Sequence, residues 1–193
     1  MKETSQFEQE LWRTVEILRS GGSILYPTDT IWGVGCDATN YEAVDNIYRI
    51  KHRLESKSLI VLIDDVSQLE EYVENVPEIA YDLIDSLDKP TTIIYSNAIN
   101  LASNVIAPDG SIAIRVTKDP FCRDLIKLLG RPIVSTSANI SGDPSPVIYR
   151  DVPDEILNGV DYIVNLHHDR MNSPKPSTII RLFENGEFSI IRN

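Results

Sequence analysis

Apolar residues in the first third of the chain alternate between helical and extended spacing. Phe7, Leu11, Val15 and Leu18 recur on one helix face, and Gly21-Gly22 is expected to end that helix. The next expected elements are a short strand over residues 23–26, a helix capped by Asn40 that carries apolar residues to Ile50, and a buried strand over residues 59–63.

The rest of the chain continues this alternation. Ser67 and Glu70 form a capping-box pattern that predicts a helix start, and Pro77 fits the first turn of the next helix. Asn185-Gly186 predicts a two-residue hairpin turn between the last two strands. Further strands are expected at 91–95, 112–116, 133–136, 162–164, 177–182 and 188–192, and a helix at 120–129. This order predicts an α/β or α+β domain around a mixed sheet.

Length and composition are those of an ordinary globular protein. The 193 residues suit one domain over residues 1–193, and 42% of them are hydrophobic and 24% charged. No apolar run approaches the ~20 residues of a membrane helix, and the first residues do not form a signal peptide, so we expect a cytoplasmic protein without membrane contact. Cys36 and Cys122 lie far apart and indicate neither a disulfide framework nor a thiolate zinc site.

The formal net charge is −11, so the positions of the basic residues are informative. An acidic chain repels a phosphate backbone, and strong direct nucleic-acid binding is therefore not expected. Lys51, His52 and Arg53 nevertheless cluster where a helix should end. They either stabilise the helix C-terminus or clamp phosphate groups, and the residues alone leave both interpretations open.

Two polar loops directly follow expected strands. The loop 27–30 leads to two glycines that permit close backbone approach, although a tight capped turn would have the same pattern. The loop 135–142 carries hydroxyl and amide groups that can bind ribose, phosphate or an amino acid, or can simply form a serine-rich turn. Three arginines on expected strands, Arg115, Arg181 and Arg192, need partners if their guanidinium groups are buried. A single buried arginine would form a salt bridge, whereas several that converge on one cavity would bind an anion.

Several chemistries are excluded by motifs that the chain lacks. It contains no G-x-x-x-x-G-K-[ST], G-x-G-x-x-G or G-x-S-x-G motif, and its three histidines lack metal-binding spacing. The residues therefore indicate a site for an anionic, hydroxyl-bearing ligand, without a metal held by side chains.

Seven segments match motifs in the order found in one protein family. They are 26–35 (Y-P-T-[ED]-T-x-Y-G-L-G), 51–53 (K-x-R), 90–94 (the end of P-G-P-x-T), 114–116 (V-R-V), 135–142 (S-x-S-A-N-x-S-G), 176–180 (P-S-T-[IV]-[IV]) and 190–192 (I-I-R). On these segments the chain resembles the YrdC-like family from about Gly22 to Arg192. It departs from the family at Trp32, Ser58, Asp88-Lys89 and Thr117. These departures affect the shape of loops more than the chemistry, because the K-x-R and S-x-N motifs are still present.

The resemblance implies a twisted mixed sheet flanked by helices that encloses a positively lined cavity. It also implies the reaction of an L-threonylcarbamoyladenylate synthase, a nucleotidyltransferase. The amine of L-threonine captures CO2 from bicarbonate, the carbamate attacks the α-phosphate of ATP, and pyrophosphate leaves. Mg2+ is expected to accompany ATP, and the product is expected to pass to partner proteins that modify tRNA.

The resemblance also implies roles for individual residues. Lys51 and Arg53 would be the catalytic residues at the triphosphate. The ATP site would further include Ser135, Ser137, Asn139 and Arg192, and the threonine site would include Thr30, Arg115 and Ser177. Two alternatives remain: an RNA-binding module or paralogue without this activity, and a carbamoyl-phosphate-using domain like that of hydrogenase maturation proteins.

Overall fold

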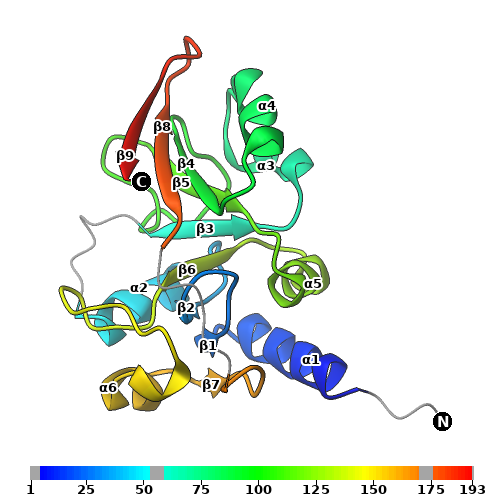
Figure 1. Cartoon of the computed structure of the whole chain (residues 1–193), viewed down its shortest axis with the longest axis vertical. Coiled ribbons are helices and arrows are strands. Elements are labelled where there is room, and N and C mark those ends of the chain that lie inside the picture. The colour runs from blue at the N-terminus through cyan, green and yellow to red at the C-terminus, as the bar shows by residue number, and fades with distance from the viewer. Residues whose placement is uncertain (1–4, 53–58, 170–175, 193) are drawn as a thin grey trace.

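The computed structural model describes residues 5–52, 59–169 and 176–192, and its centre is one mixed β-sheet. Nine strands in these ranges follow the order β7-β1-β2-β6-β3-β5-β4-β8-β9 (Figure 1). They are β1 Ile24–Tyr26, β2 Gly33–Gly35, β3 Ile60–Ile63, β4 Thr91–Tyr95, β5 Ile112–Val116, β6 Ile133–Ser137, β7 Tyr162–Ile163, β8 Thr178–Leu182 and β9 Phe188–Arg192. The pairs β1–β7, β3–β5 and β4–β8 are parallel and the other neighbours are antiparallel, which confirms the expected mixed sheet.

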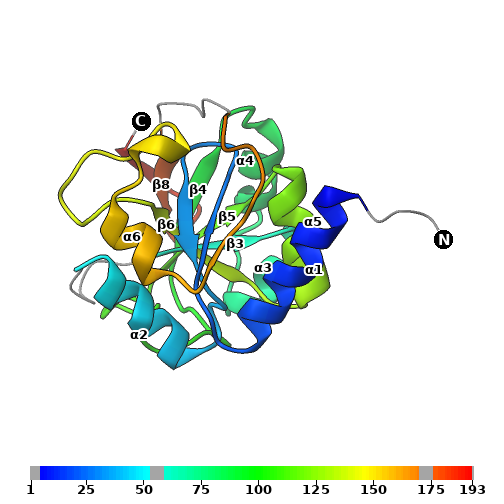
Figure 2. The same ribbon diagram turned by 90° about the horizontal axis from the view of Figure 1, so that it is seen from below.

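Helices flank this sheet on both sides. Helices α1 (Gln6–Arg19) and α5 (Pro120–Leu129) lie together on one side, while α2 (Tyr41–Ile50) and α6 (Asp154–Gly159) lie on the other (Figure 2). The short helices α3 (Leu69–Tyr72) and α4 (Ile79–Ser86) lie beside β4 and β5 at the far end (Figure 1). Within the described ranges, no helix is long and apolar enough to cross a bilayer.

The longer helices begin at polar caps that the sequence supplies. The Ser5 hydroxyl accepts a hydrogen bond from the Glu8 N–H at 3.2 Å, and the Glu8 carboxylate accepts one from the Ser5 N–H at 2.9 Å. This capping box satisfies two backbone donors at the start of α1. Asn40 and Asp119 accept the equivalent bonds at the starts of α2 and α5, so the expected helix starts are confirmed there.

Apolar faces of these helices and strands form two buried clusters on the sheet. One gathers Leu11, Val15 and Leu18 of α1 with side chains of α5 such as Leu125, so the helical periodicity of the sequence marks a real core face. The other is larger and surrounds Trp32, which is fully buried. The buried charged side chains among the described residues are Asp37, Lys51 and Arg115, and burial of a charge is costly unless it is paired.

Strand β2 and the start of α3 differ from what the sequence predicts, and each difference has a physical reason. Strand β2 was not predicted, but the close backbone approach expected at its glycines is confirmed: a Cβ at Gly35 would lie 2.2 Å from the Val134 carbonyl oxygen, so only glycine permits this strand pairing. Ser67 starts no capping box, because Asp65 caps a 3-10 turn (Val66–Gln68) before α3.

The hairpin between β8 and β9 is confirmed, but its turn is longer than predicted. Phe183 and Glu187 pair through the Phe183 N–H, so the loop between them has residues 184–186. Within this loop, only Gly186 adopts a positive φ, of 83°. A two-residue turn of the predicted kind would require a positive φ at Asn185 as well. Helix α6 was not predicted, because its six residues are too few to show a periodic pattern.

Candidate functional site

A cavity of about 290 Å³ lies on one face of the sheet, where four parts of the chain meet. The loop between β1 and β2 forms one wall, β6 and its following residues another, and residues of β3, β4 and β5 the floor. The segment that enters β8 and the end of β9 complete it. Its lining residues are Thr28, Thr30, Ile31, Gly33, Leu59, Ile60, Ile94, Ala113, Arg115, Ser135, Thr136, Ser137, Ser145, Pro176, Ser177, Ile179 and Arg192.

Arg115 is the buried cation of this cavity. Its place on β5 sets it opposite Leu62 of β3, and only 4% of its surface is exposed. Its Nη1 donates to the Thr30 hydroxyl at 3.4 Å, and its Nη2 lies 3.3 Å from Oδ1 of Asp29. Both contacts are long for charge-assisted hydrogen bonds, which are about 2.7–2.9 Å. The guanidinium is therefore held in place without its donors being fully used.

The Thr30 hydroxyl belongs to a directed chain of hydrogen bonds. The Thr28 hydroxyl donates to the Ile31 carbonyl oxygen at 2.7 Å and lies 3.0 Å from the Thr30 hydroxyl. Because the proton of Thr28 is already committed, the Thr30 hydroxyl donates to Thr28 and accepts from Arg115. These hydrogen bonds fix the orientation of the Thr30 hydroxyl toward Arg115 at the cavity.

Two polar atoms beside this chain have no hydrogen-bond partner. They are Nε of Arg115 and Oδ1 of Asp29, both buried; the 3.3 Å ion pair of that Oδ1 with Nη2 of Arg115 is not aligned as a hydrogen bond. Leaving a buried polar group without a hydrogen bond costs about 1–3 kcal/mol, and more for a charged group. Native proteins contain few such atoms, so a ligand that supplies an acceptor to Arg115 would be favoured.

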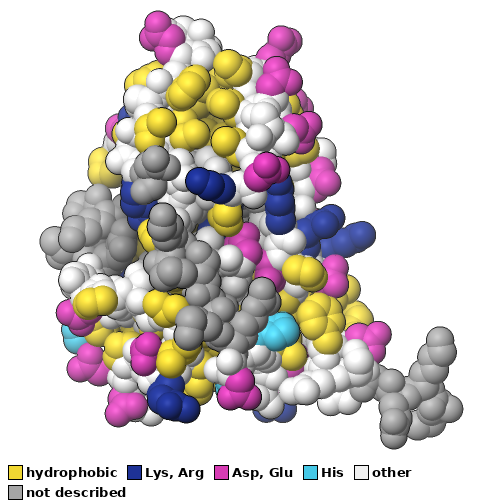
Figure 3. Space-filling view, viewed as in Figure 1, with side chains coloured by type: hydrophobic (Ala, Val, Ile, Leu, Met, Phe, Trp, Pro, Cys, Tyr) yellow, Lys and Arg dark blue, Asp and Glu magenta, His cyan; other side chains and the backbone are white. Residues whose placement is uncertain are grey.

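Arg192 brings a second cation to the same cavity. Its Nε and Nη2 donate to the Ser177 carbonyl oxygen at 3.1 and 2.8 Å, which ties the end of β9 to the start of β8. Burial, and then the neighbouring charge of Arg115, lower the pKa of Arg192. Two guanidinium groups that repel each other across one cavity are stabilised by an anion between them. Figure 3 shows the wider setting, a band of Lys and Arg side chains across the middle of one face.

The hydroxyl of Ser177 is bonded within the protein. It lies 2.8 Å from the hydroxyl of Thr92 on β4, and both residues are buried. This pair joins the two parallel strands β4 and β8 at the cavity edge. Either hydroxyl retains a lone pair for a ligand donor.

Lys51 lies behind the loop that follows β6. It is 1% exposed, and its ammonium donates to the carbonyl oxygens of Ser137 and Asn139 and, at 3.4 Å, to the side-chain oxygen of Asn139. The Asn139 amide in turn donates to the Asp143 carbonyl oxygen. The Lys51 ammonium therefore binds carbonyl groups of the loop and stabilises the conformation of that loop.

The structure brings together most of the residues that the sequence singled out. Thr30, Arg115, Ser135, Ser137, Ser177 and Arg192 all line the cavity. Lys51 and Asn139 are placed in the layer that supports its loop wall, and Arg53 lies outside the described residues. Arg181 belongs elsewhere, because it pairs with Asp109 at 3.2 Å.

Sequence reasoning missed three polar residues of this region. Thr28 and Asp29 belong to the same polar loop as Thr30, and Thr92 belongs to the segment 90–94, so the signal was present in the motifs. What the motifs do not show is that Asp29 faces Arg115, because that contact joins residues 86 positions apart. In the described part of the chain no group of three or more His, Cys, Asp or Glu side chains could hold a metal ion.

Comparisons with known proteins agree with this architecture. The sequence model of the Sua5, YciO and YrdC proteins, described as telomere recombination, matches residues 16–193, and the chain belongs to that family. A protein of Pseudomonas aeruginosa strain UCBPP-PA14 named threonylcarbamoyl-AMP synthase is 35% identical over 151 residues, which cover 74% of this chain and 81% of that protein.

Solved structures show the same fold. Escherichia coli YciO superposes with a TM-score of 0.83 at 25% identity and covers 99% of this chain and 91% of its own. Sua5 of Pyrococcus abyssi, solved in complex with L-threonine, has a TM-score of 0.81 at 26% identity over 94% of this chain. The chain spans about half of that Sua5 chain, of which 52% is covered.

Proposed function

We propose that this chain is an L-threonylcarbamoyladenylate synthase, which makes threonylcarbamoyl-AMP and pyrophosphate from L-threonine, bicarbonate and ATP. The observation that carries the proposal is that two cations, Arg115 and Arg192, line one cavity together with Thr30 and Ser177, which carry hydroxyl groups. Such a set of groups suits an amino-acid carboxylate, a hydroxyl and a phosphate together. The names of the related proteins support the same reaction.

In this proposal the threonine end of the cavity is organised around Arg115. Its guanidinium donates to the threonine carboxylate, which supplies the acceptor that Nε lacks. The Thr30 and Ser177 hydroxyls bind the remaining polar groups of threonine. Held in this way, the threonine amine, once carboxylated, presents its carbamate oxygen to the nucleotide, and positioning of this kind supplies much of the catalysis.

The nucleotide end would be formed by the loop after β6 and by Arg192. The Ser135 and Ser137 hydroxyls bind phosphate or ribose oxygens, and Arg192 together with Arg53 of the K-x-R pair neutralises phosphate charge, while the buried Lys51 acts through the loop. A carbamate oxygen forms a bond to the α-phosphorus while the bond to the pyrophosphate oxygen breaks, so no covalent enzyme intermediate is needed. The bond from Lys51 to the loop carbonyls keeps the serines in place.

Mg2+ is proposed to enter with ATP and to neutralise charge on the triphosphate. The cavity offers hydroxyl groups that can hydrogen-bond metal-bound water, so the ion would be held through the nucleotide and water. We further propose that the reaction takes place in the cytoplasm and that the product passes to tRNA-modifying proteins. The net charge of −11 argues against strong direct binding of the tRNA itself.

The test is pyrophosphate release from ATP with and without L-threonine and bicarbonate. Release should require both, and serine should replace threonine with a loss of ~1–3 kcal/mol in specificity, because it lacks one methyl group. Valine should release far less pyrophosphate, since it leaves the buried hydroxyl partners unpaired. Release that ignores the amino acid, or equal rates with valine and threonine, would refute the proposal.

A further inference from the structure

A second cavity, of about 230 Å³, lies on the opposite face of the same strands. Residues alternate along a strand, so Arg115 faces the first cavity while Ile114 and Val116 face the second. Helices α3 and α4 cover this second face (Figure 1). The lining residues are Asp29, Leu69, Ile84, Leu87, Asp88, Lys89, Pro90, Thr91, Ile93, Tyr95, Ile114, Val116 and Lys118.

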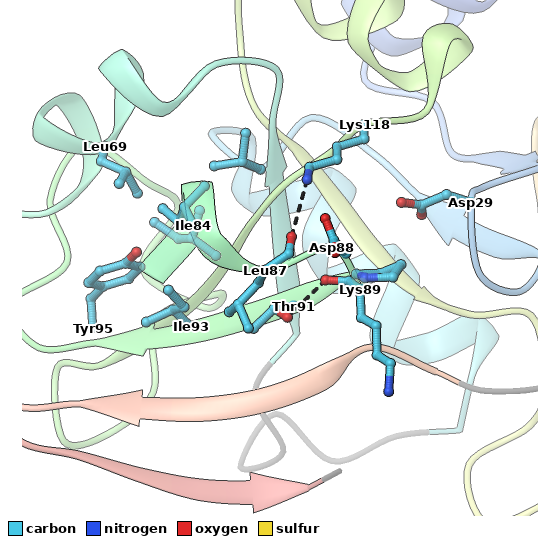
Figure 4. A pocket seen from close by; sticks show the side chains of 13 residues that line it. Asp29, Leu69, Ile84, Leu87, Asp88, Lys89, Thr91, Ile93, Tyr95 and Lys118 are labelled. Carbon is cyan, nitrogen blue, oxygen red and sulfur yellow. Dashed lines mark hydrogen bonds between the residues drawn. The ribbon is translucent and has the colours of Figure 1, made fainter. Parts of the chain in front are cut away.

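The second cavity has an apolar floor and a charged mouth. Leu69, Ile84 and Ile93 with the ring of Tyr95 form the floor, whereas Asp88, Lys118 and Asp29 lie at the other end (Figure 4). The Lys89 side chain points away from them in this view. The Lys118 ammonium donates to the Leu87 carbonyl oxygen at 3.2 Å and remains exposed, so two of its three donors are open to a ligand.

Asp29 links the two cavities. It lines the second cavity, yet its Oδ1 lies 3.3 Å from Nη2 of Arg115, which lines the first. That oxygen is buried, and its ion pair with Arg115 is long and not aligned as a hydrogen bond. A ligand that brings a positively charged hydrogen-bond donor to the mouth of this apolar cavity would supply the hydrogen bond that the ion pair does not.

We propose that the second cavity binds a free amino acid with a large apolar side chain, such as leucine or phenylalanine. The side chain occupies the floor, the ammonium binds Asp29 and Asp88, and the carboxylate binds Lys118. Drug-sized ligands occupy pockets of about 300–1,000 Å³, so a cavity of about 230 Å³ suits a smaller molecule of this class. A mouth with both charge signs selects a zwitterion over an amine or a carboxylic acid of the same shape.

The bound amino acid also changes the threonine cavity. Asp29 competes with a ligand carboxylate for Arg115, and an ammonium that takes Asp29 removes this competition. Threonine binding should therefore tighten by ~5-fold or more, at the lower end of common coupling between sites. This second part rests on the proposed function, because it assigns Arg115 to threonine.

Isothermal titration of the protein with L-leucine and L-phenylalanine tests the binding, without ATP or threonine. Lys118→Ala should weaken leucine binding at least ~10-fold through loss of a charge-assisted bond, whereas Lys127→Ala on the exposed face of α5 should not. Leu87→Trp should block the cavity. Isopentylamine and 4-methylpentanoate, each lacking one charged group, should bind more weakly than leucine.

Absence of leucine binding to the wild-type protein at millimolar concentration would overturn the proposal, and so would binding that Lys118→Ala and Leu87→Trp both leave unchanged. Titration of threonine in the presence of saturating leucine then separates the two sites. Tighter threonine binding supports the coupling, and simple competition shows that leucine occupies the first cavity and overturns it. If threonine does not bind at all, the proposed function fails while the leucine isotherm still decides the second site.

Discussion

Lys51 and Arg115 are both buried cations beside one cavity, but their surroundings differ. The Lys51 ammonium has several oxygen atoms of the loop after β6 around it. The Arg115 guanidinium has only long contacts to Thr30 and Asp29, and its Nε has no hydrogen bond. The comparison teaches that burial alone does not identify a ligand-binding cation. The hydrogen bonds that a buried cation lacks are more informative than those it makes.

The largest expected effect is a loss of folding stability when Lys51 is replaced. Lys51→Met should lower the free energy of unfolding by about 3 kcal/mol or more, because buried loop carbonyl groups lose a charged donor. For a protein of this size that corresponds to a fall in Tm of roughly 6–12 °C. Thermal and urea unfolding measure it, with Lys127→Met as the control on the exposed surface of α5. A melting temperature equal to that of wild type would show that Lys51 is not a structural support.

Arg115 should show the opposite behaviour. Arg115→Gln should reduce threonine affinity by about 10-fold to 100-fold, equivalent to ~1.5–3 kcal/mol for a charge-assisted bond. Its effect on unfolding should be smaller than that of Lys51→Met, since the contacts it loses are long. Calorimetric titration with threonine gives the affinity. Arg181→Gln is the matched control, because Arg181 lies on β8 and pairs with Asp109 outside this cavity; equal losses in both variants would contradict the assignment.

The smallest effect concerns Asn139, which supports the loop together with Lys51. Asn139→Ala removes the bond from its amide to the Asp143 carbonyl oxygen and should cost ~1 kcal/mol of stability. Lys51 would still hold the carbonyl groups of Ser137 and Asn139. Urea unfolding should therefore rank the three proteins wild type, Asn139→Ala and Lys51→Met in falling order. A loss at Asn139 as large as that at Lys51 would mean that the side chains act as one unit.

The fold could be predicted from the sequence wherever the local pattern agrees with the tertiary structure. Helices α1 and α5 combine caps with a long apolar face, and both were predicted. Strand β2 was not, because glycines at 33 and 35 have low strand propensity and are required only by the close approach of Val134. A contact between distant strands determines that choice, and no local window contains it.

The site shows the same limit. Six of the predicted residues line one cavity, because strands β5, β6 and β9 and the loops beside β1 and β8 bring their motifs to one face of the sheet. The position of Lys51 was less predictable, since three cations at a helix end usually indicate an exposed, solvated patch. Its burial depends on the loop after β6, which lies 86 residues away. The contact of Asp29 with Arg115 likewise depends on how the sheet closes.

The strand order also has a consequence for how the protein folds. Strand β7 pairs with β1, and β8 pairs with β4, so these ladders join segments far apart in the chain. Domains rich in such non-local pairings fold slowly, because loop-closure entropy is lost before the contacts form. Thr30 and Arg192 are far apart in the sequence, and the cavity that both line is completed only when the β8–β9 hairpin docks. The binding cavity therefore cannot form before strands that are distant in the sequence have paired.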